Sequence, residues 1–207
     1  MNSTWLIGIA GPSGAGKTTL AERVARDLGA PILSLDCYYR DLPGLAFEER
    51  ARLNFDEPAA LDSGLLVGHL ERLASGADIE VPVYDFSRHL RAPRTTTLRA
   101  ADFAVVEGLF ALYWSEVRAL LGTAVFVSAE DGLCFERRLE RDIRERGRTP
   151  ESVAGQYRAT VRPMAERHVL PTRAFADVVV SGAALLDLSA AAVLSHVRGA
   201  RALAVRA

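Results

Sequence analysis

The fold of this chain is decided by the stretch Trp5-Leu6-Ile7-Gly8-Ile9-Ala10-Gly11-Pro12-Ser13-Gly14-Ala15-Gly16-Lys17-Thr18. An apolar run of strand length leads into the pattern G-x-x-x-x-G-K-[ST], and a helical stretch over residues 17–28 follows it. Strand, glycine-rich loop and helix in this order form a phosphate-binding loop. Among the 25 lysine and arginine residues of the chain, Lys17 is the only lysine, and it stands at the lysine position of the pattern. This placement supports the interpretation that the chain binds a nucleoside triphosphate.

The chemistry of the loop explains why these residue types are needed. Glycines let the backbone fold around phosphates with N–H groups pointing inward, and the helix N-terminus adds the positive end of its dipole. The compact ammonium of Lys17 fits between phosphate oxygens where a wider guanidinium does not. The hydroxyl of Thr18 is placed for Mg²⁺. The residues expected to bind the triphosphate are Gly11, Ser13, Gly14, Ala15, Gly16, Lys17, Thr18 and Thr19.

Composition and charge favour a protein that acts on small molecules. The chain has 207 residues, of which 49% are hydrophobic, enough to bury the core of one domain over 1–207 with a small insert. Its net charge of −1 gives no general attraction for nucleic acids or anionic membranes. Cys37 and Cys134 are too few for a disulfide framework or a zinc site. We expect neither a signal peptide nor a membrane helix of about 20 apolar residues, and hence a location in the cytoplasm.

Apolar runs of strand length alternate with amphipathic stretches of helix length. The predicted strands are 5–10, 31–35, 103–106, 123–128 and 176–181, and the predicted helices are 17–28, 58–74, 115–121, 131–146, 151–168 and 184–197. This alternation predicts an α/β fold of three layers, with a mainly parallel sheet and helices on both faces. Residues 79–100 contain two β-like segments and are expected to form an antiparallel hairpin beside that sheet.

Two acidic residues follow predicted strands of the parallel sheet. Asp36 comes directly after the strand 31–35, and Glu107 comes directly after the strand 103–106. Ligands of open parallel sheets lie at the carboxyl ends of the strands, so both carboxylates are expected beside the phosphate loop. Transfer of a phosphoryl group needs one group that deprotonates the attacking hydroxyl and an acid that holds Mg²⁺ or its waters. Asp36 and Glu107 are the candidates for these two roles.

Residues 135–148 carry six arginines and four acidic residues. Part of this pattern is typical of an exposed helix with ion pairs one turn apart, such as Arg138 with Asp142 and Arg141 with Glu145. The arginines continue past the paired run, through Arg146 and Arg148. Phosphoryl transfer benefits from mobile arginines that close over the triphosphate. We therefore expect a lid at about 137–150 that carries Arg138, Arg141, Arg146 and Arg148.

Several short motifs resemble those of the uridine kinases, also called uridine-cytidine kinases, from Ile7 to about Val180. Besides the phosphate loop, the matching segments are Asp36-Cys37-Tyr38-Tyr39, Asn54-Phe55-Asp56-Glu57-Pro58, Tyr84-Asp85-Phe86-Ser87-Arg88-His89, Glu107-Gly108-Leu109, Arg141-Asp142-Ile143-Arg144-Glu145-Arg146-Gly147-Arg148, Gln156-Tyr157 and Leu170-Pro171-Thr172. Each match is weak alone, but their common order and spacing are specific. The chain departs from the family pattern at Cys37, at Pro12 and Thr18 in the loop, and at Glu57, which stands where the family has a histidine and is expected beside the sugar site.

The resemblance implies a role for each matching residue. Asp36 is implied as the catalytic base facing the ribose 5′-hydroxyl, with Lys17, Arg141 and Arg146 acting near the phosphates. The residues implied in nucleoside binding are Tyr39, Phe55, Asp56, Tyr84, Phe86, His89, Arg138, Arg148 and Gln156, with Asp56 on the 2′- and 3′-hydroxyls. Thr18 and Glu107 remain the candidates for Mg²⁺. A planar base favours aromatic faces, and Phe55, Tyr84 and Phe86 supply them.

The activity that the resemblance implies is ATP-dependent phosphorylation of uridine and cytidine to UMP and CMP. The sequence does not fix the phosphate donor, and GTP stays open as an alternative to ATP. A homotetrameric assembly and control by pyrimidine triphosphates are further implications of the resemblance. One alternative is a related kinase that acts on another small alcohol or riboside, and another is a nucleotide-binding relative without catalysis. A GTPase switch is excluded because its N-K-x-D motif needs a second lysine.

Overall fold

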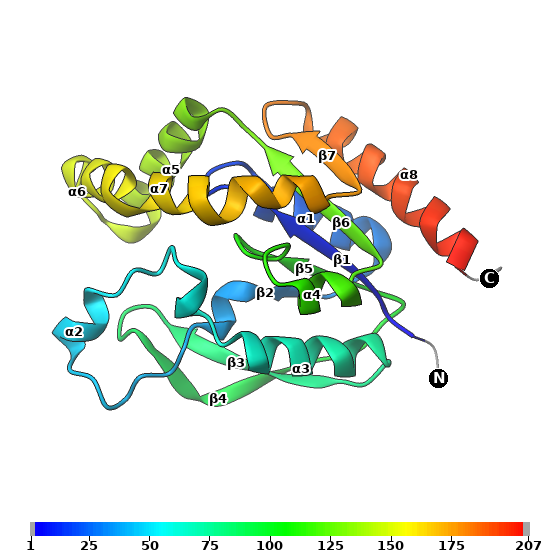
Figure 1. Cartoon of the computed structure of the whole chain (residues 1–207), viewed down its shortest axis with the longest axis horizontal. Helices are drawn as coiled ribbons and strands as arrows, with labels where there is room; N and C mark the ends of the chain where they lie inside the picture. The colour runs from blue at the N-terminus through cyan, green and yellow to red at the C-terminus, as the bar shows by residue number, and fades with distance from the viewer. Residues whose placement is uncertain (1–2, 205–207) are drawn as a thin grey trace.

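The computed structural model describes residues 3–204 and contains a five-stranded, entirely parallel sheet (Figure 1). Its strands are β1 (Trp5–Ala10), β2 (Ile32–Ser34), β5 (Phe103–Glu107), β6 (Thr123–Ser128) and β7 (Val178–Ser181). They lie in the order β2-β5-β1-β6-β7, so β1 occupies the centre. The phosphate loop therefore leaves the middle of the sheet, where neighbouring strands on both sides end close to it.

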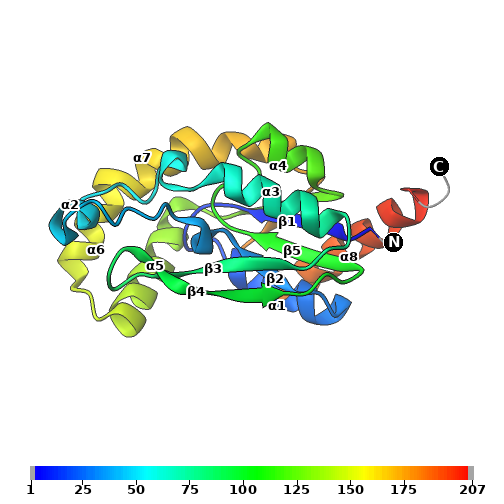
Figure 2. The ribbon, with the colours of Figure 1, turned by 90° about the horizontal axis from the view of Figure 1, so that it is seen from below.

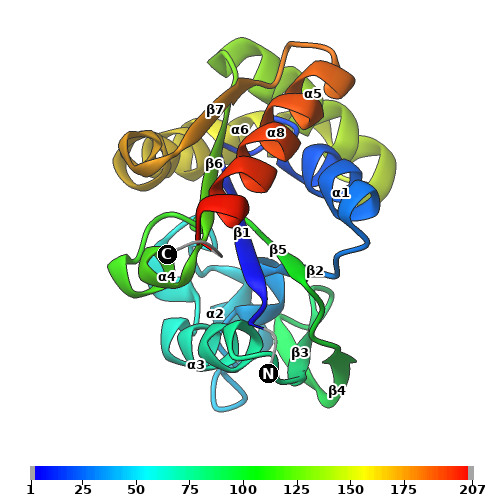
Figure 3. The same cartoon turned by 90° about the vertical axis from the view of Figure 1, so that its right-hand side faces the viewer.

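Helices cover both faces of the sheet (Figure 3). The helices are α1 (Lys17–Leu28), α2 (Phe47–Ala51), α3 (Ser63–Ala74), α4 (Ser115–Leu120), α5 (Asp131–Arg146), α6 (Pro150–Gln156), α7 (Arg162–Met164) and α8 (Leu186–Ala204). The helices α1 and α8 pack on one face, while α3 and α4 pack on the other. The predicted three-layer α/β fold is confirmed.

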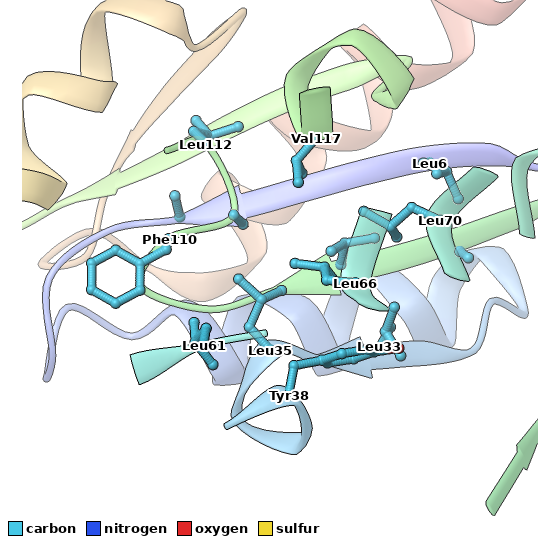
Figure 4. Packing of buried hydrophobic residues seen from close by; sticks show 14 of the residues in the cluster. Leu6, Leu33, Leu35, Tyr38, Leu61, Leu66, Leu70, Phe110, Leu112 and Val117 are labelled. Atoms are coloured by element: carbon cyan, nitrogen blue, oxygen red, sulfur yellow. The ribbon is translucent and has the colours of Figure 1, made fainter. Parts of the chain in front are cut away.

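The sequence of β1 explains why the sheet is buried on both sides. Successive side chains of a strand point to opposite faces. Leu6 packs with Leu66 and Leu70 of α3, as seen in Figure 4, whereas Ile7 and Ile9 belong to the opposite core beneath α1 and α8. An apolar side chain is thus needed at nearly every position, which accounts for the uninterrupted apolar runs of the parallel strands.

The predicted hairpin consists of β3 (Ile79–Asp85) and β4 (Leu90–Leu98), paired antiparallel beside the β2 edge of the main sheet (Figure 2). Ile79 and Val81 point into the core shared with α3. Glu80 points outward, where its carboxylate accepts hydrogen bonds from Thr95 at 2.7 Å and Thr97 at 2.6 Å. The alternation of apolar and polar residues fixes which face of the hairpin is buried.

Some predicted boundaries were wrong. The helix expected over 151–168 widens into π-helical turns at Tyr157–Val161 and Ala165–Val169, on either side of Pro163, which lacks a backbone N–H and disfavours a regular α-helix. The helix expected over 58–74 begins only at Ser63, because Asp62 caps it by accepting a hydrogen bond from the Leu65 N–H at 3.2 Å. The short α2 was not predicted.

Within residues 3–204, the structure has no helix that is both long and apolar enough to cross a membrane.

Candidate active site

The phosphate loop lies between β1 and α1 and depends on glycine at several positions, of which Gly14 and Gly16 show the reason. Gly14 and Gly16 have φ angles of 83° and 96°, in the left-handed region that favours glycine. A Cβ atom on Gly14 would also collide with the backbone carbonyl of Cys134 in α5. The loop can therefore pass close to α5, which brings the arginines of that helix to the phosphate site.

Lys17 begins α1 and is buried beneath the loop. Its Nζ donates a hydrogen bond to the carbonyl of Pro12 at 3.1 Å. Burial lowers the pKa of Lys17, while the nearby carboxylates of Glu107 and Asp36 raise it again. A buried cation held by a single carbonyl is well prepared to bind a phosphate oxygen.

Glu107 ends β5, directly beside the end of β1. Its Oε2 accepts a hydrogen bond from the Thr18 hydroxyl at 3.3 Å. Burial raises the pKa of Glu107, and Lys17 opposes the rise. Mg²⁺ in kinases is held by one or two protein oxygens together with substrate phosphates. The Thr18 hydroxyl and the Glu107 carboxylate fit this donor set.

Asp36 lies in a 3₁₀ turn, Leu35–Tyr38, that follows β2. The turn is stabilised by the Ser34 hydroxyl, which accepts a hydrogen bond from the Asp36 N–H at 3.3 Å. The Asp36 carboxylate is open to solvent in the cleft, and the surrounding protein walls raise its pKa while Lys17, Arg146 and Arg141 lower it. A carboxylate with a raised pKa beside a phosphate-binding cation is suited to accept a proton from a hydroxyl.

A cleft of about 850 Å³ opens on one side of the loop. It brings together predicted site residues that are far apart in the sequence: Ser13, Lys17, Thr18, Asp36, Tyr39, Phe55, Asp56, Phe86, His89, Glu107, Arg138, Arg141, Arg146, Arg148 and Gln156. Tyr84 is not part of this lining. Its ring packs under that of Tyr39, with the centroids 5.2 Å apart, so it supports the aromatic wall from behind.

The aromatic wall of the cleft consists of Tyr39, Phe55, Phe86 and His89. The rings of Phe55 and His89 are stacked, with centroids 4.9 Å apart and an angle of 23° between their planes. The Tyr39 hydroxyl donates to the Phe55 carbonyl at 3.2 Å, while Phe86 is 55% exposed at the cleft opening. These flat faces form a slot that can receive a planar base.

His89 has two unusual features. Its φ angle of 52° lies in the left-handed region, and its Nδ1 is buried without a hydrogen-bond partner in the described part of the chain. Burial lowers the pKa of His89, and Arg50 lowers it further, so the imidazole is neutral at physiological pH. A neutral ring with an unpaired nitrogen can either donate or accept a hydrogen bond.

Asp56 is buried at the base of the cleft, where its Oδ2 accepts a hydrogen bond from the Thr160 hydroxyl at 3.2 Å. Burial raises the pKa of Asp56, and the charge of Arg138 opposes this effect. Glu57, which the sequence placed beside the sugar site, instead lines a separate cavity of about 170 Å³ behind Phe55. It accepts a hydrogen bond from the Asn54 amide there, at 3.2 Å. Residues 54–57 form a turn in which the Glu57 N–H donates to the Asn54 carbonyl at 3.3 Å, so that Asp56 lines the cleft and Glu57 does not.

Arg138 differs from the mobile lid arginine that was expected. Its side chain is buried and donates to the Ser13 hydroxyl at 2.9 Å and to Gln156 Oε1 at 3.1 Å. Arg148 also donates to Gln156 Oε1, at 2.6 Å. Guanidinium groups only donate, so these bonds fix the amide of Gln156 with its oxygen toward the arginines. Its NH₂ group has no hydrogen-bond partner within residues 3–204.

The expected pair between Arg141 and Glu145 is absent among the described residues. Glu145 accepts from Arg144 at 2.6 Å, and Arg141 instead donates to its neighbour Asp142. Asp142 is completely buried and contacts the guanidinium groups of all four predicted lid arginines. The sequence predicted that these arginines belong to the site, but it did not predict that all four contact the same carboxylate.

A second cavity, of about 340 Å³, lies along the phosphate loop and is lined by Ala15, Gly16 and Thr19. Gly182, after β7, lines it from above, and its carbonyl accepts a hydrogen bond from Arg137 Nη1 at 2.9 Å. No motif in the sequence predicts this cavity, since none of them marks the backbone after β7.

The chain has a P-loop kinase fold. This fold is defined by a central parallel strand, a glycine-rich loop, a buried lysine and arginines from a following helix. The phosphoribulokinase / uridine kinase family matches residues 6–189, and the chain belongs to this family.

Two relatives and one solved structure give the extent of the similarity. A uridine kinase from Deinococcus deserti is 46% identical over 179 residues, which are 85% of this chain and 86% of the relative. A uridine kinase from Chloroflexus aurantiacus is 40% identical over 198 residues, 94% of this chain and 95% of the relative. The structure of phosphoribulokinase from Rhodobacter spheroides has a TM-score of 0.62 at 15% identity, covers 87% of this chain and 71% of the other, and shares the fold.

Proposed function

We propose that this protein transfers the γ-phosphoryl group of ATP to the 5′-hydroxyl of uridine and cytidine. The observation that carries the proposal is the cleft of about 850 Å³, in which an aromatic slot, the buried carboxylate of Asp56 and Lys17 of the glycine-rich loop line one space. Relatives named uridine kinase, at 40–46% identity over most of the chain, support the same activity.

In the proposed reaction, Asp36 accepts the proton of the 5′-hydroxyl. A bond forms between the 5′ oxygen and the γ phosphorus, the bond between that phosphorus and the bridging oxygen breaks, and ADP leaves. Lys17, Arg141 and Arg146 stabilise the charge on the transferred group. Mg²⁺, held through Thr18 and Glu107, neutralises the charge on the phosphates when bound.

The base is proposed to lie in the aromatic slot, where His89 and Gln156 contact its edge. Uracil has an acceptor oxygen at position 4 and cytosine has a donor amine there. Because Arg138 and Arg148 occupy the oxygen of Gln156, its NH₂ group can only donate to the base. His89 is then the group that adapts, through its choice of tautomer, to uridine or cytidine.

The donor nucleotide is proposed to lie in the second cavity, on the other side of the loop from the nucleoside. Gly16 and Thr19 border this cavity at the start of α1, where a triphosphate would approach Lys17. ATP is the proposed donor, and GTP is the alternative to compare with it.

Initial rates with ATP and Mg²⁺ on a panel of nucleosides test this function. We expect phosphorylation of uridine and cytidine at the 5′ position, as identified by ³¹P NMR of the product, and no turnover of adenosine or guanosine. We expect 2′-deoxyuridine to lose on the order of 10²-fold in kcat/KM, because Asp56 would keep its desolvation cost without a hydroxyl partner. Turnover of a different small alcohol, with uridine inert, would reject the proposal.

The phosphate donor and the oligomeric state are tested separately. GTP in place of ATP in the same assay measures the donor preference. Light scattering after gel filtration checks the homotetramer implied by the sequence resemblance.

A further inference from the structure

The four arginines of the cleft share one counter-ion. Asp142, in the last turn of α5, has a side chain with 0% exposure. Its Oδ1 accepts from Arg141 Nε at 3.1 Å and Nη2 at 2.9 Å, and lies 3.4 Å from Arg146 Nη1. Its Oδ2 accepts from Arg148 Nη1 at 3.2 Å and lies 3.7 Å from Arg138 Nε.

This arrangement is electrostatically unusual. Four guanidinium groups around one carboxylate repel one another, and Asp142 lies within 4 Å of each of them. Burial alone would raise the pKa of Asp142, but the hydrogen bond from Arg141 and the charges of Arg138 and Arg146 hold it below its ordinary value. The carboxylate is therefore ionised at neutral pH and keeps the four cations together.

The contacts leave room for a ligand. A guanidinium has five N–H donors, and Asp142 uses only one or two on each arginine. Arg141 and Arg146, with side chains 34% and 50% exposed, also line the cleft on the side of Lys17 and Asp36. Their remaining donors are available in the cleft, while Asp142 restricts where each group can lie.

We propose that Asp142 is a positioning residue for phosphoryl transfer, which holds Arg141 and Arg146 at the transferred phosphoryl group and Arg138 and Arg148 at the nucleoside. This inference rests on the proposed roles of these arginines. Asp142 does not itself line the cleft, whereas the four arginines do. It acts by limiting the positions of the arginines, so its effect is expected on the transition state more than on ground-state binding.

The Asp142→Asn variant tests the proposal. We expect kcat with uridine to fall by about 10- to 10²-fold, the usual effect of misplacing groups around a reacting centre. The variant has one negative charge fewer beside the proposed triphosphate site. The affinity for a non-hydrolysable ATP analogue, measured by calorimetry, should therefore be equal to or tighter than that of the wild type. Glu136→Gln is the matched control, since it changes the same charge at an exposed position of α5 and should alter neither quantity more than about twofold.

A double-mutant cycle separates positioning from a general structural role. If Asp142 acts through Arg141, adding Asp142→Asn to Arg141→Ala should cost much less in kcat/KM than adding it to the wild type. If the calorimetric titration gives far less than one bound ATP analogue per chain, Asp142→Asn is not folded, and Asp142→Glu replaces it in the same cycle. The longer side chain keeps the charge but displaces the arginines, so kcat should again fall with binding retained.

Three results would overturn the proposal: an unchanged kcat in a folded Asp142 variant, a loss of analogue binding that matches the loss of kcat, or full additivity with Arg141→Ala. Each of these leaves the proposed function standing if the wild type still phosphorylates uridine. A wild type that phosphorylates no nucleoside rejects the proposed function instead.

Discussion

At the scale of single residues, Lys17 shows how a side chain is matched to its place. It is buried, it donates to the Pro12 carbonyl, and it lies near Glu107 and Asp36. A guanidinium has the same charge but is wider and planar, so it cannot occupy this position without displacing the loop. The chain uses arginine at every other basic position, which underlines the specific need for lysine here.

We therefore predict that Lys17→Arg reduces kcat/KM by at least about 10²-fold, in the range for losing a preorganised charge at the transition state. Steady-state kinetics at saturating Mg²⁺ measure this. The reverse exchange at an exposed position of the same helix, Arg26→Lys, serves as the control and should retain activity. Turnover like that of the wild type in Lys17→Arg would refute the role given to the ammonium.

Asp36 illustrates a conflict between activity and stability. The protein walls raise its pKa above the value in the unfolded chain. Above the folded pKa, the ionised carboxylate thus costs free energy in the folded state, a cost that asparagine does not have. We predict that Asp36→Asn is inactive and yet has a higher Tm than the wild type at pH 7.

Thermal unfolding at several pH values checks the sign of this effect. The increase in Tm of Asp36→Asn over the wild type should disappear as the pH falls below the pKa of aspartate in the unfolded chain. At such a pH the wild-type carboxyl is neutral in both the folded and the unfolded state. For a chain of this size, 1 kcal/mol moves Tm by about 2–4 °C, which a thermal scan resolves. A lower Tm for Asp36→Asn at pH 7 would contradict the stated pKa direction.

The sequence was sufficient to identify some of these residues but not others. Asp36 and Glu107 follow from the rule that parallel strands end at the ligand, and the structure places both in the cleft. Asp142 could not be recognised in the same way. Spacing along a helix indicates partners one turn away, whereas Arg141 and Arg148 reach Asp142 from one and six positions away.

At the scale of secondary-structure elements, Arg91 joins the hairpin to the segment that carries Asp36. From β4, its Nε donates to the Tyr39 carbonyl at 2.9 Å, and its Nη2 donates to the Tyr38 carbonyl at 3.3 Å. The same Nη2 contacts the carboxylate of Asp62 at 3.2 Å. Through these bonds one side chain sets the position of the aromatic wall relative to the 3₁₀ turn that carries Asp36.

We predict that Arg91→Met, which keeps the apolar stem, lowers the free energy of unfolding by about 1–3 kcal/mol because buried carbonyls lose their donor. It should also raise KM for uridine more than KM for ATP, since the hairpin contributes Phe86 and His89 to the nucleoside side only. Denaturant titration and initial rates measure the two effects. The control is Arg94→Met, an exposed position of the same strand, and equal effects of the two variants would refute the role of Arg91.

The elements themselves were mostly predictable, while several of their ends were not. Patterns of apolar residues predicted the parallel strands and the hairpin because burial determines those patterns. The end of β2 and the start of α3 depend instead on hydrogen bonds of Ser34 and Asp62 with nearby backbone. Such local bonds compete with regular structure and are hard to detect from periodicity.

At the scale of the whole molecule, the phosphate loop separates two cavities. The cleft of about 850 Å³ contains the aromatic slot and Asp36, and the cavity of about 340 Å³ lies along the start of α1. The strand order β2-β5-β1-β6-β7 explains this arrangement, because β2 and β5 deliver their carboxylates to one side of the loop and β7 delivers Gly182 to the other. Two substrates can thus meet at Lys17 from opposite sides.

The central claim is that the nucleoside lies in the larger cavity and the donor in the smaller one. A crystal structure with a bisubstrate analogue, in which uridine and adenosine are joined through their 5′ oxygens by a tetraphosphate, tests it most directly. We predict uracil in the slot between Phe55 and Phe86, the uridine 5′ oxygen within about 2.6–3.2 Å of an Asp36 oxygen, and adenine beside Gly182. Uridine bound outside the larger cavity, or a 5′ oxygen beyond the reach of Asp36, would contradict the account.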